Sequence, residues 1–361
     1  MNVVSESRLA SLRQRWEPPA RPRPIVFIGA GGIVNDAHAP AYRSGGFPLA
    51  GVYDPDPVRA RSTAAKWGVE RVCESFEQAA AIPGAIFDVA VPPQVLRETV
   101  ERLPRGCVAL LQKPMGVDLA DATRIRGACR ERGIRAAVNL QLRFAPSMLA
   151  LQSAIERGLL GRVVELEVHV NCRMPWELWP FLEGLERMEI ALHSIHYLDT
   201  IRALLGEPRS VLARTVRHPD APKLASSRTT AILDYGDDVR CALSINHHHK
   251  HGTRHQSSEM RVEGTLGAAV VVMGVNLDYP RGRPDSIEIA TEGEAWERVP
   301  LVGNWFPDAF FARMSQVQRF ACGEEASLVG SVDDAWRTMA LVEALYRSNA
   351  SGGTPVPRED A

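Results

Sequence analysis

The chain has 361 residues, of which 45% are hydrophobic and 24% are charged, and its formal net charge is −1. This length is enough for two domains with full cores. The near-neutral charge argues against a nucleic-acid partner, and no apolar run is long enough to span a bilayer. The six cysteines stand far apart without a CxxC pair, which favours reduced thiols in a cytoplasmic protein over a disulfide framework or a zinc site.

Residues 1–23 form a polar N-terminal extension without the apolar segment of a signal peptide. From Pro24 onward, short apolar runs alternate with helical patterns such as "DPVRARSTAAKWG". The apolar runs predict five strands, at residues 24–30, 49–54, 87–93, 107–114 and 134–140. Continuously apolar strands separated by helices are typical of a parallel, doubly wound sheet. Residues 24–143 are therefore predicted to form an α/β domain of this kind.

After about Arg143 the pattern changes to strands with one exposed face. Alternating apolar and polar residues predict strands at 163–172, 210–218, 229–236, 240–248, 258–264 and 286–293. Helical patterns interrupt them at roughly 187–205, 307–322 and 332–349. Repeated strands without intervening helices favour a large, open, mostly antiparallel sheet. Residues 144–361 are therefore predicted to form a second domain of the α+β class.

The stretch "VFIGAGGIVNDAHAP" begins where the first strand ends, and it precedes a predicted helix. This is the context of the dinucleotide-binding fingerprint of a Rossmann domain. The first glycine permits the tight turn, and the second lets the backbone approach a pyrophosphate at the helix N-terminus. Val34 stands in place of the third glycine, whose role is packing, so the anion site is expected to remain. The predicted cofactor contacts of the loop are Gly29, Gly31, Gly32 and Ile33.

Asp54 ends the second predicted strand, about twenty residues after the loop. An acidic side chain there binds the ribose 2′-hydroxyl and repels a 2′-phosphate, which favours NAD over NADP. The later strands end at the same crevice, where Pro92 and Lys113 are expected. A lysine ammonium at this place can stabilise a developing alkoxide, although solvated surface lysines are more common.

The predicted helix at 187–205 has one apolar face, and its other face carries Glu189, His193 and His196, with Asp199 beside it. Two histidines with acids nearby are suited to proton transfer. A merely solvated polar face is the alternative interpretation. Trp305, in the stretch "NWFPDAF", is expected either to pack in the core or to anchor a loop near the site.

Several segments in the same order resemble the Gfo/Idh/MocA oxidoreductases, named after glucose–fructose oxidoreductase and inositol dehydrogenase. The resemblance begins near Pro24 and covers nearly the whole remaining chain. It rests on "GAGGIVNDAHAPAY", "QKPMGVDLADA", "NLQLRFAP", "HYLDTIRALLGEP", "VEGTLGA" and "SVDDAWRTMALVEALYRSNASGGTPVP". It implies NAD(P)-dependent chemistry on sugars, cyclitols or related polyols, with the second domain serving substrate binding and oligomerisation. By this resemblance Lys113 matches the lysine of the EKP segment, His196 the catalytic histidine and Asp199 the final aspartate.

The sequence departs from the family pattern at three positions. Gln112 replaces the acid of EKP, Leu192 stands where many members have an aspartate, and Ser194 replaces a glycine. An acidic partner of the histidine is thus missing from its expected place. Glu189 lies one helical turn before His193, so these two side chains are predicted to be in contact.

The resulting hypothesis is reversible oxidation of a secondary or anomeric hydroxyl. His196 exchanges the proton, Lys113 orients and polarises the reacting oxygen, and His193 shapes the pocket. Candidate substrate contacts are Asn139, Arg143, Asn171, Arg173, Trp176, Trp179 and His193; the tryptophans are equally consistent with core packing. Two alternatives stay open. One is redox-neutral elimination, epimerisation or glycoside cleavage with transiently reduced NAD, and the other is a non-catalytic NAD-binding regulator.

The stretch "NHHHKHGTRH" invites a metal site, but none is predicted here or elsewhere. On a strand, His247 and His249 share one side and His248 lies on the other. A polar strand end at a subunit contact, or one histidine reaching the substrate, explains the run without a metal; the part played by His251 stays open. An open sheet with one uncovered face predicts a homodimer or homotetramer.

Overall fold

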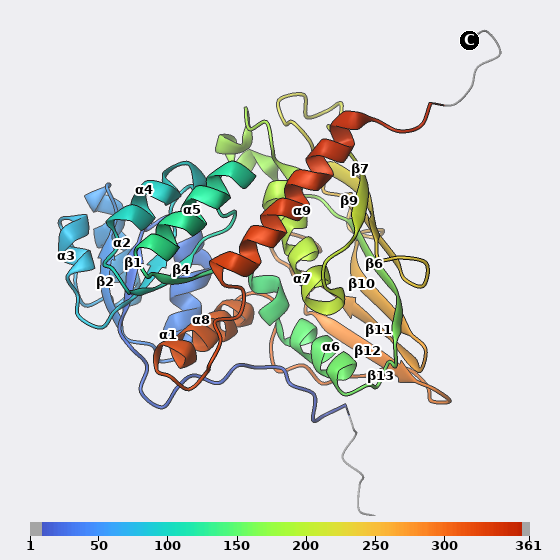
Figure 1. Ribbon diagram of the computed structural model, residues 1–361, viewed down its shortest axis with the longest axis horizontal. Helices are drawn as coiled ribbons and strands as arrows, with labels where there is room; N and C mark the ends of the chain where they lie inside the picture. The colour runs from blue at the N-terminus through green and yellow to red at the C-terminus, as the bar shows by residue number, and fades with distance from the viewer. Residues whose placement is uncertain (1–8, 356–361) are drawn as a thin grey trace, which may run out of the picture.

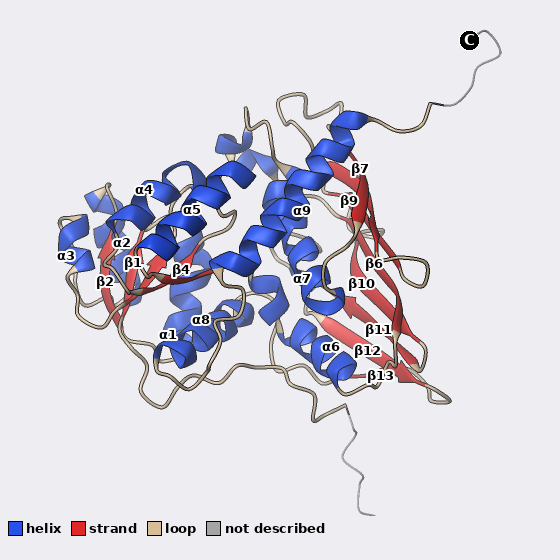
Figure 2. Cartoon of the chain, viewed as in Figure 1, coloured by secondary structure: helices blue, strands red, loops and turns tan. Residues whose placement is uncertain are grey.

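The computed structural model describes residues 9–355. The chain forms two lobes side by side, each built around its own sheet, with helices between the sheets (Figure 1). Coloured by secondary structure, the smaller sheet has helices on both faces, whereas the larger sheet is covered on the inner side only (Figure 2). The predicted combination of a doubly wound domain and a large open sheet is confirmed.

The first sheet has five parallel strands in the order β2-β1-β3-β4-β5. The strands are β1 (Ile25–Ile28), β2 (Leu49–Tyr53), β3 (Ile86–Val89), β4 (Val108–Leu111) and β5 (Arg135–Val138). Its helices are α1 (Ala39–Ser44), α2 (Pro57–Trp67), α3 (Phe76–Ala80), α4 (Pro93–Arg102) and α5 (Leu119–Glu131). Strands β1, β3 and β4 are buried along their whole length because helices cover both faces, which explains their continuously apolar sequences. All five strands end at one edge, where the glycine loop lies.

The second sheet has eight strands in the order β13-β12-β11-β10-β6-β9-β8-β7. They are β6 (Val163–Asn171), β7 (Ser210–Val216), β8 (Arg228–Asp234), β9 (Arg240–Asn246), β10 (Ser257–Gly264), β11 (Gly267–Val272), β12 (Ser286–Thr291) and β13 (Glu297–Arg298). Among these pairs only β6 and β9 run parallel. Strand β11 escaped the sequence-based prediction because "GAAVVV" is continuously apolar and does not alternate.

The remaining helices are α6 (Pro146–Glu156), α7 (Ile195–Leu205), α8 (Asp308–Ala321) and α9 (Val332–Ser351). Helix α9 contacts both β7 of the second sheet and α5 of the first domain. Helix α8 returns to the first domain, where Phe310 and Met314 join the same hydrophobic cluster as Phe27. The segment 144–361 therefore supplies the second sheet and also part of the first domain's helical cover.

The described part of the N-terminal extension runs from residue 9 across the second domain to the first strand (Figure 1). Leu9 and Leu12 are buried. The Gln14 side chain donates to Pro300 O at 3.0 Å and accepts from Val302 N at 2.9 Å. Although the extension is polar, residues 9–23 are thus attached to the second domain. Within residues 9–355 no helix has both the length and the apolar character needed to cross a membrane.

Candidate active site

The glycine loop leaves one side of its backbone open. Gly29 has φ +103°, and a Cβ there would come within 2.4 Å of Ala90 O, so the turn requires glycine. A Cβ on Gly31 would meet nothing within 4 Å, and one on Gly32 only an Asp36 oxygen at 3.6 Å. This open backbone is the surface that a pyrophosphate needs to approach. Val34 begins the π-helical segment η1 (Val34–His38), and its side chain is fully buried in the core, as expected for a packing position.

Two polar side chains fix this loop. Asn35 donates to the carbonyls of Ala30 and Gly31, each at 3.1 Å, and its own oxygen accepts from Trp67 Nε1 at 3.0 Å. Asp54 lies just after β2, as predicted, and its Oδ2 accepts from Ala30 N at 2.8 Å. The carboxylate that is predicted to bind the ribose thus also holds the loop. Asn35 was not predicted from the sequence, where its only sign was an amide three residues after Gly32.

A buried histidine connects the glycine loop to Lys113. His38 Nδ1 lies 2.7 Å from Asp88 Oδ2, and its Nε2 lies 3.1 Å from the amide nitrogens of both Gln112 and Asn139. Gln112 Oε1 accepts from the Lys113 N–H at 2.7 Å, which turns its NH₂ group toward His38. His38 Nε2 must then be an acceptor, so Nδ1 is the nitrogen that donates to Asp88. His38 was not predicted from the sequence, because a lone histidine in an apolar helix is usually a core residue.

Asn139 was predicted to bind substrate, and the structure does not support direct contact. It is completely buried, and its amide is directed at His38. Its position directly after β5 made it a candidate, but none of its surface is exposed. The contact with His38 favours a supporting role for Asn139.

Lys113 links the two domains. It follows β4, and its Nζ donates to Leu192 O at 2.8 Å, in the π-helical segment η5 (Ile190–Ser194) that precedes α7. Burial lowers the pKa of Lys113 to about 8. The positive charge of the Lys113 ammonium acts on both predicted histidines, and its Nζ has one protein acceptor among the described residues.

His193 and His196 face this lysine. The Nδ1 atoms of both rings are buried without a hydrogen-bond partner among the described residues. Burial and the positive charge of Lys113 are among the causes that hold the pKa of each histidine well below its usual range. The His193 ring centroid lies 5.4 Å from that of Trp176, and the His196 centroid lies 5.9 Å from that of Trp305. Lys113, the two histidines and the two tryptophans thus gather in one place.

The predicted contact between Glu189 and His193 is wrong, because the helix begins with a π-turn. A π-turn brings residue i+5 over residue i, where an α-helix would bring residue i+4. Ser194 Oγ accordingly donates to Glu189 Oε1 at 2.8 Å, and Thr229 binds the other carboxylate oxygen. Glu189 is completely buried and instead lies 3.5 Å from His247 Nε2.

The histidine run separates into different environments. His247 is buried, with Nδ1 3.4 Å from Cys172 Sγ, whereas His248 stacks on His218 at 4.0 Å between ring centroids. His249 Nδ1 lies 3.3 Å from the amide of Asn171. Within residues 9–355 no three His, Cys, Asp or Glu side chains are grouped as metal ligands.

Three further substrate candidates have protein partners of their own. Asn171 donates to His255 O at 3.0 Å and accepts from Asn246 at 2.8 Å, so it ties strand ends together. Arg173 pairs with Glu177 at 3.1 Å on the surface. The Trp179 ring centroid lies 5.8 Å from that of Tyr279, so Trp179 packs on this neighbouring loop.

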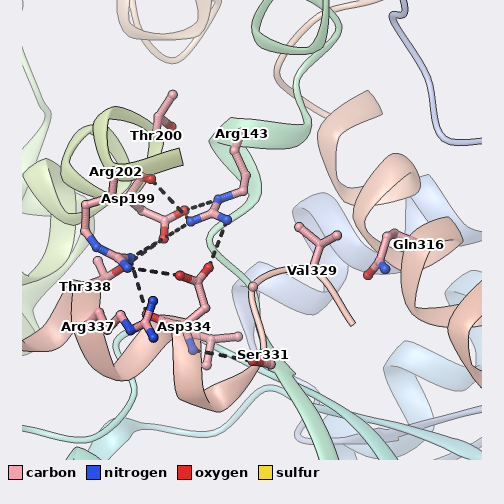
Figure 3. A network of polar contacts seen from close by, with 12 residues as sticks. Arg143, Asp199, Thr200, Arg202, Gln316, Val329, Ser331, Asp334, Arg337 and Thr338 are labelled. Carbon is pink, nitrogen blue, oxygen red and sulfur yellow. Dashed lines mark hydrogen bonds and ion pairs between the residues drawn. The ribbon is translucent and has the colours of Figure 1, made fainter. Parts of the chain in front are cut away.

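Arg143 and Asp199 belong to a buried ion-pair network that joins α7 and α9 (Figure 3). Arg143 Nε lies 2.6 Å from Asp199 Oδ2, and its Nη1 lies 3.0 Å from Asp334. Asp199 also accepts from Thr338 at 2.8 Å, and Arg202 pairs with Asp334 at 3.0 Å. The three guanidinium nitrogens of Arg143 and both oxygens of Asp199 have protein partners here. These contacts favour a structural role for both residues over the predicted substrate binding and proton transfer.

Two family models match the chain. One, described as an oxidoreductase family with an NAD-binding Rossmann fold, matches residues 23–140, and the other, the GFO/IDH/MocA C-terminal domain, matches residues 148–270. Among characterised relatives, D-apiose dehydrogenase of Rhizobium rhizogenes is 28% identical over 91% of this chain and 96% of its own length. Inositol 2-dehydrogenase of Rhizobium meliloti is 29% identical over 90% of this chain and 96% of its own length.

Solved structures show the same fold. An oxidoreductase from Agrobacterium radiobacter, crystallised with NAD+, L-tartaric acid and magnesium, gives a TM-score of 0.77 at 23% identity and covers 92% of this chain and 98% of its own. A levoglucosan dehydrogenase in complex with NADH gives a TM-score of 0.75 at 17% identity, with coverage of 92% and 98%.

Proposed function

Because the chain belongs to the GFO/IDH/MocA family of NAD-binding oxidoreductases, we propose that it oxidises a hydroxyl group of a sugar, cyclitol or related polyol, reversibly and with NAD as the hydride acceptor. One observation carries this proposal. The ammonium of Lys113, held at 2.8 Å by Leu192 O, lies beside the partnerless ring nitrogens of His193 and His196. A cation and a neutral base together fit the loss of a hydroxyl proton.

The cofactor fits the open side of the glycine loop. Gly29 keeps the loop close to Ala90, while the backbone at Gly31 and Gly32 is free for a pyrophosphate. The proposed contacts to NAD are Gly29, Gly31, Gly32, Ile33, Asp54, Pro92 and Lys113. When bound, the nicotinamide supplies the acceptor for the hydride. Asp54 disfavours a 2′-phosphate, so NADP is the poorer cofactor.

In the proposed roles Lys113 orients the reacting hydroxyl and stabilises its developing negative charge. His196 accepts the hydroxyl proton, and His193 shapes the pocket next to Trp176. Both rings are neutral at pH 7 because burial lowers the pKa of each well below its usual range, so each can accept a proton. Trp176 offers an apolar ring face for the C–H groups of a sugar.

The test is NADH formation by the purified protein across aldoses, cyclitols and sugar acids. We expect turnover with NAD on one substrate class, weaker turnover with NADP, and loss of turnover in His196→Gln. The matched control is His248→Gln, whose ring stacks on His218 away from this pocket. NAD binding without net NADH from any substrate would favour redox-neutral chemistry with retained cofactor. NAD binding without turnover, at an affinity that Lys113→Met leaves unchanged, would favour a non-catalytic regulator.

We also propose that the protein is a cytoplasmic homodimer or homotetramer. The outer face of the second sheet exposes 66% of Leu212 and 51% of Ile232, and a second copy would cover such apolar side chains. All six cysteines lie within the described residues and are unpaired, as is usual for a reducing compartment. Sedimentation of the full chain at micromolar concentration tests the assembly, and a monomer would refute it.

A further inference from the structure

A buried acid–histidine pair lies directly behind His193. Glu189 Oε1 and His247 Nε2 are 3.5 Å apart, and the centroids of the His247 and His193 rings are 4.8 Å apart. Glu189 exposes none of its surface and His247 only 1%. Neither side chain has a part in the proposed chemistry, and both sit deeper than the pocket.

The fold fixes both members of this pair. The π-turn directs Glu189 toward Ser194 and Thr229, whose hydroxyls bind its two oxygens. His247 follows β9, and its N–H donates to Ser227 O at 3.0 Å. Cys172 Sγ lies 3.4 Å from Nδ1 on the opposite side of the ring. The His247 ring thus lies between Cys172, which contacts Nδ1, and Glu189, whose Oε1 is 3.5 Å from Nε2, with His193 against it.

We propose that Glu189 and His247 form a positioning pair that keeps His193 neutral and oriented, in place of the acidic side chain that is missing at Leu192. The inference rests on the proposed function in one respect, namely that His193 belongs to the reacting pocket. The acidic side chain is thus Glu189, which the π-turn directs away from His193. It acts on His193 through His247, which follows strand β9.

Charge explains how the pair acts. Burial disfavours the charged form of His247, but its contacts with Cys172 and Glu189 outweigh burial and raise its pKa to about 9. A protonated His247 neutralises the buried carboxylate of Glu189, which would otherwise be costly. After burial, the positive charge of His247 is the largest cause that lowers the pKa of His193.

The charged and titratable groups near His247 and His193 come from several elements. Glu189 and His193, at the π-turn, face His247 on one side, and Cys172, at the end of β6, faces it on the other. The hydroxyls of Tyr197 and Tyr346 lie close enough to Glu189 for its charge to raise the pKa of each. Lys113 and His196 act on His193 and also lower its pKa. Cys172 and the carboxylate of Glu189 both favour a proton on His247, and neither is among the groups that shift the pKa of His193.

The protonation of His193 should determine the acid side of the pH profile. A neutral His193 keeps a second positive charge away from Lys113, so activity should fall as the pH drops through the pKa of His193. Removing the charge of His247 raises that pKa toward the ordinary value of about 6.5. The acid limb of the pH profile of kcat/KM should then move up by about one pH unit or more. A merely structural pair would lower stability without moving this limb.

The first experiment uses the full-length wild-type protein without cofactor, with histidine ring carbons labelled for NMR titration. The chain has 10 histidines, and single His→Gln variants assign the signals. We expect His247 to be protonated at pH 7 and His193 to titrate with a pKa well below its usual range. A neutral His247 at pH 7 overturns the proposal, and this measurement needs no destabilised variant.

The second experiment compares Glu189→Gln and His247→Gln with the matched control His248→Gln. Glu189→Gln and His247→Gln should each raise the pKa of His193 and move the acid limb of the kcat/KM profile to higher pH. His248→Gln should change neither the pKa of His193 nor the position of the acid limb. An unchanged His193 titration in a folded His247→Gln protein overturns the proposal. Absence of turnover on every sugar would refute the proposed function alone, because the ring titrations would still report the coupling.

Discussion

The glycine loop and the histidine pocket are held by contacts of different range. The side chains that fix the loop lie near it in the sequence: Asn35 follows it directly, and Asp54 is 24 positions from Ala30, whose N–H it binds. The pocket is assembled from distant segments, with Lys113 from the first domain and His247 from the end of β9 packed on one π-turn. The cofactor side is therefore a local motif, whereas the substrate side is a product of the tertiary fold.

This contrast predicts that damage to the second domain should impair the histidine pocket while leaving the glycine loop able to bind NAD. The ion-pair network of Arg143, Asp199 and Asp334 offers the largest test, because it joins the helix of the pocket to α9 (Figure 3).

Asp199→Ala removes the carboxylate that Arg143 and Thr338 bind, and it leaves the Arg143 guanidinium buried with Asp334 alone. Breaking a buried pair in this way should lower the free energy of unfolding by about 3–5 kcal/mol, as measured by urea denaturation. Asp238→Ala is the control, since its pair with Arg162 is on the surface, and it should leave the unfolding midpoint nearly unchanged. If Asp199→Ala is stable and binds NAD but has no turnover, Asp199 has a catalytic role and not only a structural one.

Lys113→Met removes the ammonium that lies between the two regions. We expect kcat to fall by about a hundred- to a thousandfold, since the charge acts mainly on the developing alkoxide. The dissociation constant of NAD, measured by calorimetry, should change far less. Lys223→Met is the matched control, because Lys223 is exposed and pairs with Glu183 at 3.0 Å. Equal losses in kcat and in NAD affinity would mean that Lys113 serves chiefly the cofactor.

The same contrast explains which features were predictable from sequence. The glycine turn, Asp54 and the five buried strands follow from spacing and apolar runs, because the physics that fixes them is local. The contact of Glu189 was mispredicted because nothing in "RMEIALHSIHYLD" reveals that the helix begins with a π-turn. The partners of Arg143, Asn139 and His38 lie far away in the chain, so their burial depends on how the domains pack.

Asp54→Asn tests the cofactor side alone. The amide oxygen can still accept from Ala30 N, now 2.8 Å from Asp54 Oδ2, so the glycine loop should keep its shape. The bond that Oδ1 accepts from Asp56 N at 2.9 Å is lost, because an amide has only one acceptor oxygen. The negative charge that opposes a 2′-phosphate is lost, and the ratio of kcat/KM for NAD over NADP should fall by about ten- to a hundredfold. Asp56→Asn is the control, since the Asp56 side chain caps α2 and pairs with Arg59. An unchanged ratio of kcat/KM for NAD over NADP would show that Asp54 does not select the cofactor.

Val34→Gly restores the third glycine of the fingerprint, and we expect it to have the smallest functional effect. Val34 is fully buried and packs helix against strand, so its removal opens space in the core and adds backbone freedom within a helix. The free energy of unfolding should drop by about 1–3 kcal/mol, while the dissociation constant of NAD stays within about twofold, because this position does not face the pyrophosphate. Val34→Ala separates lost packing from added backbone freedom. Tighter NAD binding in Val34→Gly would show instead that valine holds the helix too far from the strand, and the loop would then depend on packing as much as the pocket does.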